Sequence, residues 1–225
     1  MNGSAIRSVF PFLSVILLTA LMPQNLPAAE SQRRPLPIVD QAAKDSSFLA
    51  FRNDLQAAIR SRDASVVYAA LSPELFYSFP PYRGHEGFAA RLQLQERSSQ
   101  FWGVLDTLLS QGGGFIREGL FAAPYVPFTW PAELDGEAFV AATATDAPVY
   151  KTPDEKSPAA GKLSWEIVRL VQPWQADPGW VKVAMPDGGE GYLAKRFCRG
   201  AVDWRAGFEK QPDGTWKIKF FVGRD

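Results

Sequence analysis

The sequence predicts an α+β fold, in which a mainly helical N-terminal domain is followed by a small β-barrel and a C-terminal β-hairpin. Three observations favour this fold. Apolar residues in the N-terminal half recur at spacings of three and four, the period of a helix. From Ala138 onward, short runs of alternating apolar and polar residues are separated by Gly, Pro and Asp, which is typical of short strands. Near the C-terminus, Asp213-Gly214 separates two such runs and predicts a hairpin turn.

The first helices follow a proline-containing lead-in at residues 30–40. Asp63 is a suitable N-cap for a second helix, because its side chain can accept hydrogen bonds from the first free backbone N–H groups. A short aromatic strand is expected over residues 76–79, before a proline pair. The apolar positions that indicate the first helix are Phe48, Phe51, Leu55, Ala58 and Ile59.

Two further helices are expected over residues 86–96 and 100–109. The glycines at 112–114 end the second of these, since glycine readily adopts the positive φ of a helix stop. Residues 122–137 contain three prolines between aromatic side chains, too many for a helix or a sheet, and are predicted to be a connector. Those prolines are Pro124, Pro127 and Pro131.

The period-two region supplies the strands of the predicted barrel, which would avoid open sheet edges. The final hairpin joins residues 204–210 to residues 216–222, and its alternation places Trp216, Phe220 and Val222 on one buried face. The chain therefore divides into a leader and four segments: 1–29, 30–121, 122–137, 138–200 and 201–225. The strands expected inside the barrel segment cover residues 139–141, 167–171, 180–183 and 191–193.

Residues 1–29 have the pattern of a secretory signal peptide. Arg7 precedes an almost wholly apolar run from Val9 to Met22, and small residues follow at Ala28-Ala29. A transmembrane anchor is the alternative, but spanning a bilayer takes about 20 apolar residues and this run is shorter. We therefore expect cleavage, a periplasmic or secreted protein, and no membrane span after processing.

Charge and cysteine content exclude several classes of function. The chain has 24 basic and 24 acidic residues, and removing the leader takes one arginine and no acid. A nucleic-acid-binding protein needs a clustered basic excess, so no nucleic-acid partner is expected. A zinc site usually needs about three protein ligands, and with His85 as the only histidine we expect neither a metal nor a cofactor. Cys198 is the only cysteine, so the chain has no disulfide of its own.

Residues 138–193 resemble a bacterial SH3 domain. The resemblance lies in the order of five short motifs, with a variable loop between the first and the second: Ala147-Pro148-Val149-Tyr150, Gly161-Lys162-Leu163, Ile167-Val168-Arg169-Leu170, Gly179-Trp180-Val181-Lys182-Val183 and Gly191-Tyr192-Leu193. The whole chain is also similar to poorly characterised envelope proteins of proteobacteria. The resemblance implies an SH3-like barrel that binds a peptide or a cell-wall component, so that the expected partner is peptidoglycan or an envelope protein.

Aromatic side chains in this segment are the predicted ligand-binding residues: Trp174, Tyr150, Tyr192 and Trp180. Aromatic rings stack on sugars and prolines, although small barrels also need rings in their cores. We expect Trp180 to be mostly core and Trp174, beside Pro173, to be the most exposed ring. Loops at residues 151–160 and 172–179 would frame the groove.

Two other functions remain open at this stage. The N-terminal part is similar to cone-shaped, ketosteroid-isomerase-like folds, which implies a small-ligand pocket and would give the terminal hairpin to the N-terminal sheet. The other is a cell-wall hydrolase that uses His85, Glu86 and Cys198, although a histidine-supported nucleophile needs the two side chains to meet. We expect no catalytic residues and a binding protein rather than an enzyme.

Overall fold

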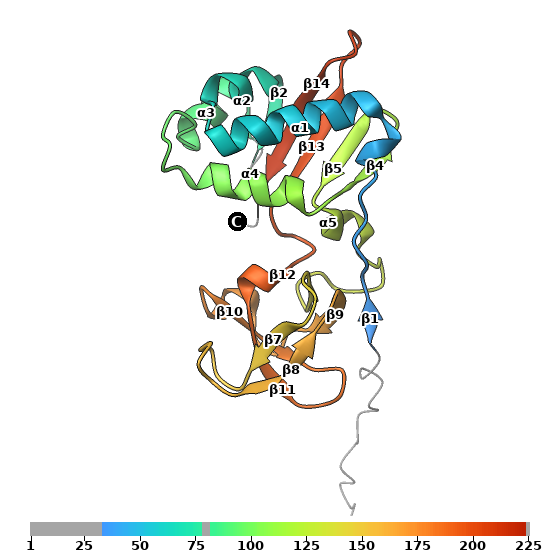
Figure 1. Ribbon diagram of the computed structural model, residues 1–225, viewed down its shortest axis with the longest axis vertical. Coiled ribbons are helices and arrows are strands. Elements are labelled where there is room, and N and C mark those ends of the chain that lie inside the picture. Colours follow the sequence, from blue (N-terminus) through green and yellow to red (C-terminus); the bar gives the residue numbers. More distant parts are fainter. Residues whose placement is uncertain (1–32, 78–81, 224–225) are drawn as a thin grey trace, which may run out of the picture.

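The computed structural model describes residues 33–77 and 82–223. The predicted signal peptide lies outside these residues. The chain forms two parts joined by a narrower waist (Figure 1). We call residues 42–123 with 204–223 the upper part, and residues 33–36 with 138–199 the lower part. No helix among the described residues is both long and apolar enough to cross a membrane.

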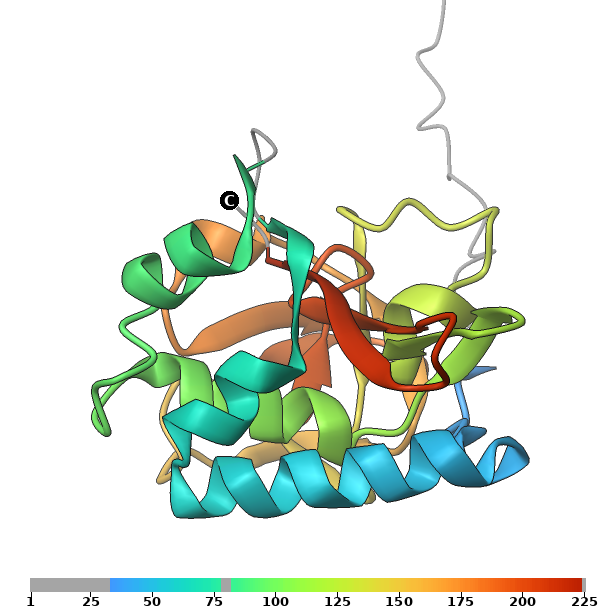
Figure 2. The same ribbon diagram turned by 90° about the horizontal axis from the view of Figure 1, so that it is seen from above.

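The upper part is built on a six-stranded sheet in the order β3-β2-β14-β13-β5-β4. The C-terminal hairpin occupies its centre, because β13 pairs with β5 and β14 runs parallel to β2 (Figure 2). The strands are β2 (Leu71–Tyr77), β3 (Tyr82–Arg83), β4 (Gly114–Arg117), β5 (Leu120–Ala123), β13 (Arg205–Lys210) and β14 (Trp216–Val222).

The helices of the upper part pack on this sheet through aromatic rings. Phe48 of α1 lies 4.1 Å, centroid to centroid, from Phe121 of β5 and 4.9 Å from Trp216 of β14. Asp45 and Asp63 cap α1 and α2 with their side chains, as the sequence predicted for Asp63. The helices are α1 (Ser46–Ser61), α2 (Ala64–Ala70), α3 (His85–Arg91) and α4 (Gln100–Ser110), preceded by the short 3-10 helix η1 (Ala42–Lys44).

The lower part consists of two four-stranded sheets, in the orders β1-β9-β6-β12 and β10-β11-β7-β8. A bridge between Leu170 and Val183 links them, and both enclose one apolar core. Two 3-10 helices, η2 (Trp174–Ala176) and η3 (Lys195–Phe197), lie in its loops. The strands are β1 (Arg34–Pro35), β6 (Phe139–Ala142), β7 (Ala147–Tyr150), β8 (Ala159–Leu163), β9 (Glu166–Arg169), β10 (Trp180–Ala184), β11 (Glu190–Ala194) and β12 (Cys198–Arg199).

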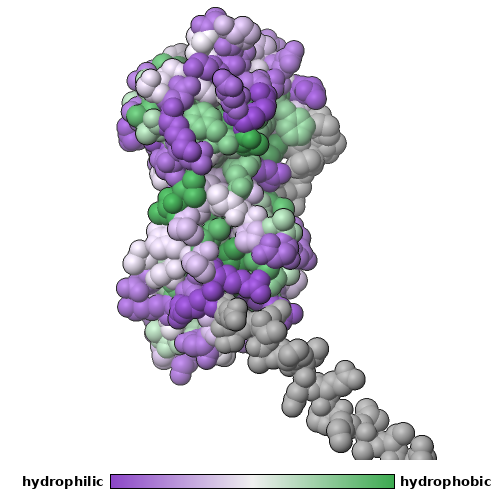
Figure 3. All heavy atoms as spheres, turned by 90° about the vertical axis from the view of Figure 1, so that its right-hand side faces the viewer, coloured by the Kyte–Doolittle hydropathy of each residue, from purple (hydrophilic) through white to green (hydrophobic). Residues whose placement is uncertain are grey.

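The waist has a small apolar core of its own. Helix α5 (Tyr125–Thr129) places Tyr125 against Leu36 and Ile167, and the Tyr125 hydroxyl donates to the Leu36 carbonyl oxygen at 3.3 Å. Figure 3 shows apolar side chains gathered on one side of this waist. Burial raises the pKa of Tyr125 to about 12. The two parts are thus held together by packed side chains as well as by the chain itself.

The predicted fold class is wrong in its N-terminal half. The molecule is mostly β, with three sheets, and the segment at 30–121 is not a helical domain. Its strands β2, β4 and β5 need the hairpin to complete their sheet, so the hairpin is not an extension of the barrel segment. Helical periodicity shows which residues face a core, but it does not show that the core lies against a sheet whose central strands are about 80 residues further along the chain.

The connector and the hairpin faces also differ from the prediction. Residues 122–137 contain the end of β5 and helix α5, because Pro127 lies in the first turn of α5, where a helix makes no use of the missing N–H. In the hairpin, Trp216 and Val222 are buried as predicted, whereas Phe220 is half-buried and Phe221 is buried instead. The register shift between Ile218 and Phe220 in the pairing with β2 moves the next ring to the core side.

Candidate functional site

Three of the four predicted binding residues lie together on one sheet of the lower part. Tyr150 of β7 and Tyr192 of β11 are direct cross-strand partners. The ring of Trp180, on β10, contacts that of Tyr150 edge to face at 5.7 Å. Val181 and Val183 point into the core, so the alternation of β10 turns Trp180 and Lys182 to the other face. We call Tyr150, Trp180 and Tyr192 the aromatic face.

Charged side chains border the aromatic face. Lys182, the cross-strand partner of Tyr192, forms an ion pair with Glu190 at 2.6 Å. The hydrogen bond from Glu190 raises the pKa of Lys182, which keeps this side chain cationic. The predicted loop at residues 151–160 is attached to η3 by the ion pair between Glu155 and Arg196 at 2.8 Å. The surface therefore offers rings, a cation and an anion within one patch of sheet.

Trp174 belongs to a different surface. It lies in η2 and lines a hollow of about 370 Å³ with Leu170, Gln172 and Pro173, none of which is in the aromatic face. The ring is half-buried against the lower core, and Lys195 Nζ lies 4.9 Å from its centroid. The expected contrast between an exposed Trp174 and a core Trp180 is wrong, since both rings are half-buried.

The structure does not bring Cys198 and His85 together. Cys198 is fully buried in the lower core, where its thiol lies 3.9 Å from the Ala194 carbonyl oxygen. His85 begins α3 in the upper part and packs edge to face against Tyr68 at 5.0 Å. Glu86, the other residue proposed for a hydrolase, is exposed on the same helix. Among the described residues no group of three or more His, Cys, Asp or Glu side chains is placed to hold a metal ion.

Burial raises the pKa of Cys198 to about 12. Because the thiolate is the reactive form, we expect iodoacetamide to leave the native protein unmodified at pH 8 and to alkylate it rapidly in denaturant. Intact-protein mass spectrometry over time measures both rates. Rapid labelling without denaturant would show that Cys198 is exposed.

Sequence reasoning missed a second group of polar residues at the waist. Arg62, Arg199 and Asp203 border a hollow along α4, together with Trp204. They come from the end of α1 and from the chain between β12 and β13, so no motif joins them in the sequence. The left-handed conformation of Arg62 (φ 54°) likewise leaves no mark in the sequence.

Comparison with known proteins adds little to this description. No protein-family model matches the chain, and no curated protein matches it. Among solved structures, it is similar to the "putative calcium/calmodulin dependent protein kinase II association domain" from Xanthomonas campestris, with 10% sequence identity and a TM-score of 0.30. The alignment covers 84% of this chain and 97% of that chain. A TM-score this low does not establish a shared fold, so the site is interpreted from its own residues.

Proposed function

We propose that this is a non-catalytic, exported binding protein whose aromatic face recognises a peptide or a cell-wall component. The observation that carries the proposal is the grouping of Tyr150, Trp180 and Tyr192 on the outer side of one sheet. Each ring is half-buried, so it is held in place by its neighbours and still offers surface to a ligand. The resemblance of residues 138–193 to bacterial SH3 domains supports the same class of ligand.

The chemistry of the aromatic face suits extended, partly apolar ligands. Flat rings stack on sugar rings and on prolines, and tyrosine hydroxyls add hydrogen bonds at the edge of such a contact. The Lys182–Glu190 pair would orient charged groups of the ligand. Three rings bury much less surface than a stable protein interface, so the affinity should be weak.

The proposal is tested by retention on purified peptidoglycan and on envelope extract. Tyr192→Ala should lower retention about fivefold, the loss expected when an interface side chain worth roughly 1 kcal/mol is removed. Tyr82→Ala is the matched control, because Tyr82 is an exposed tyrosine on β3 of the upper part. The melting curve of each variant shows whether it remains folded.

Trp174→Ala separates the two surfaces of the lower part. If the aromatic face is the site, this variant should bind like the unmodified protein, since Trp174 lines another hollow. Loss of retention in Trp174→Ala with normal retention in Tyr192→Ala would move the site to the hollow beside η2. Equal retention by all the variants would refute binding through the lower part.

A further inference from the structure

The waist holds a hollow of about 540 Å³ that runs along α4. Its walls come from three separate segments: the end of α1, the face of α4 that looks away from the sheet, and the chain that links β12 to β13. It lies outside the interior between helices and sheet, because Leu105 and Leu109 turn to that core while Gly103 and Thr107 line the hollow. We call this hollow the waist groove.

Gly103 keeps the waist groove open. A Cβ atom added at this position would meet no atom within 4 Å, so a side chain there would project into free space. Glycine inside a helix is less favourable than alanine. The fold itself therefore does not need glycine at this position, whereas an open groove does.

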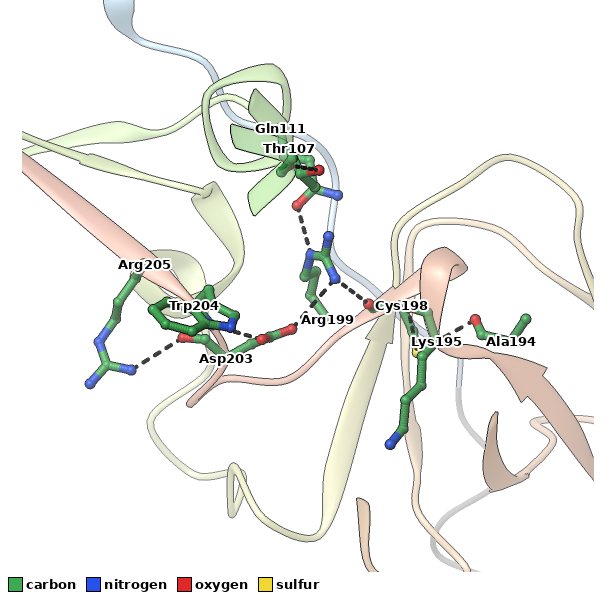
Figure 4. A network of polar contacts seen from close by, with 10 residues as sticks. Thr107, Gln111, Ala194, Lys195, Cys198, Arg199, Asp203, Trp204 and Arg205 are labelled. Atoms are coloured by element: carbon green, nitrogen blue, oxygen red, sulfur yellow. Dashed lines mark hydrogen bonds and ion pairs between the residues drawn. The ribbon is translucent and has the colours of Figure 1, made fainter. Parts of the chain in front are cut away.

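Asp203 contributes an unsatisfied acceptor to the groove. Its Oδ1 accepts the backbone N–H of Trp204 at 2.7 Å, but its Oδ2 is buried and has no hydrogen-bond partner among the described residues. The nearest cation is Arg199, whose Nη1 lies 3.6 Å from Oδ2, beyond good hydrogen-bond distance. Arg199 is held in turn by Gln111, whose Oε1 accepts from Nε at 3.1 Å (Figure 4). A buried carboxylate oxygen without a donor is unfavourable, so a ligand N–H would improve this site.

Arg62 contributes a cation on the opposite side. Its backbone ends α1 in the left-handed region, fixed by bonds from its N–H to the carbonyl oxygens of Ala58 and Ile59. Its guanidinium is exposed and forms no ion pair with any residue in the described part of the chain. Between these charges, the ring of Trp204 packs at 5.0 Å against Phe221 and supplies a rigid apolar wall.

We propose that the waist groove binds an α-amino acid unit with a free carboxylate. The ligand carboxylate pairs with Arg62, its N–H donates to Asp203 Oδ2, and its side chain packs against Trp204. One anion and one donor on adjacent ligand atoms match one unpaired cation and one unsatisfied acceptor in the groove. A free amino acid and the C-terminal residue of a peptide both have this chemistry. The site is separate from the aromatic face and does not depend on the function proposed for it.

Calorimetric titration of the mature protein with four leucine-shaped probes tests the site. Leucine represents the free amino acid and N-acetyl-leucine represents a peptide C-terminus, so the tighter of the two identifies the source. Leucinamide lacks the carboxylate and 4-methylpentanoate lacks the amino group. Each of these should bind about tenfold more weakly than the better of the first two, the loss expected for a hydrogen bond to a charged group.

Substitutions place the binding in the groove. Arg62→Asn removes the charge and keeps the left-handed helix end, which asparagine tolerates, and it should abolish the preference for leucine over leucinamide. Gly103→Phe should abolish binding by filling the groove, whereas Ala57→Phe, at an exposed position on α1, should not. The proposal is overturned if neither leucine nor N-acetyl-leucine saturates the protein at millimolar concentration. It is equally overturned if Arg62→Asn keeps the preference or a folded Gly103→Phe binds normally.

Discussion

A chain that ends at Gly200 is expected to lose the fold of the upper part completely. This truncation removes β13 and β14, the two central strands of the six-stranded sheet. It also removes Phe208, Trp216, Ile218 and Phe221 from the upper core. Burial of one such side chain contributes about 1.5–3 kcal/mol. Together they approach the whole stability of a typical domain, about 5–15 kcal/mol.

Far-ultraviolet circular dichroism and thermal unfolding measure this effect. The truncated chain should lose most of its helical signal, because α1 and α4 have no stable surface to pack on without the central strands. A full-length chain with Gly214→Ala, which strains only the hairpin turn at φ 84°, is the control and should melt slightly earlier but remain folded. A truncated chain that keeps its helices and unfolds cooperatively would mean that the hairpin is an appendage.

The second large effect concerns neighbouring rings in β14. Phe221→Ala should lower the free energy of unfolding by about 3–5 kcal/mol, because this ring is buried and contacts Phe88, Phe101 and Trp204. Phe220→Ala should cost clearly less, because Phe220 is half-buried and covers Gly207 on the other side of the strand. Urea denaturation of both variants gives the comparison.

This pair of variants also tests the register of the sheet. Regular alternation from Trp216 would bury Phe220 and expose Phe221, which is the opposite order. The register shift after Ile218 reverses it. A larger loss of stability in Phe220→Ala than in Phe221→Ala would therefore show that β14 is regular and that the bulge is absent.

Part of the candidate site follows from the sequence. Period-two alternation predicted strands β10 and β11, and ring chemistry selected Tyr150, Trp180 and Tyr192 as binding residues. Their grouping on one face depends on the pairing of β7 with β11 and of β11 with β10. The assignment of Trp174 to the same groove was wrong, because proximity in the sequence does not show which surface a loop covers.

The sequence by itself determined the local features of this protein: the caps at Asp63 and Gly112, the hairpin turn at Asp213-Gly214, and the short strands after Ala138. Each depends on interactions among residues a few positions apart, so its chemistry is visible in a short window. Only the tertiary structure decided which sheet the hairpin completes, which ring of β14 is buried, and that Arg62 and Asp203 line one groove. These features arise from pairing and packing between segments distant in the chain, where many partners share the same apolar pattern and the whole core selects among them.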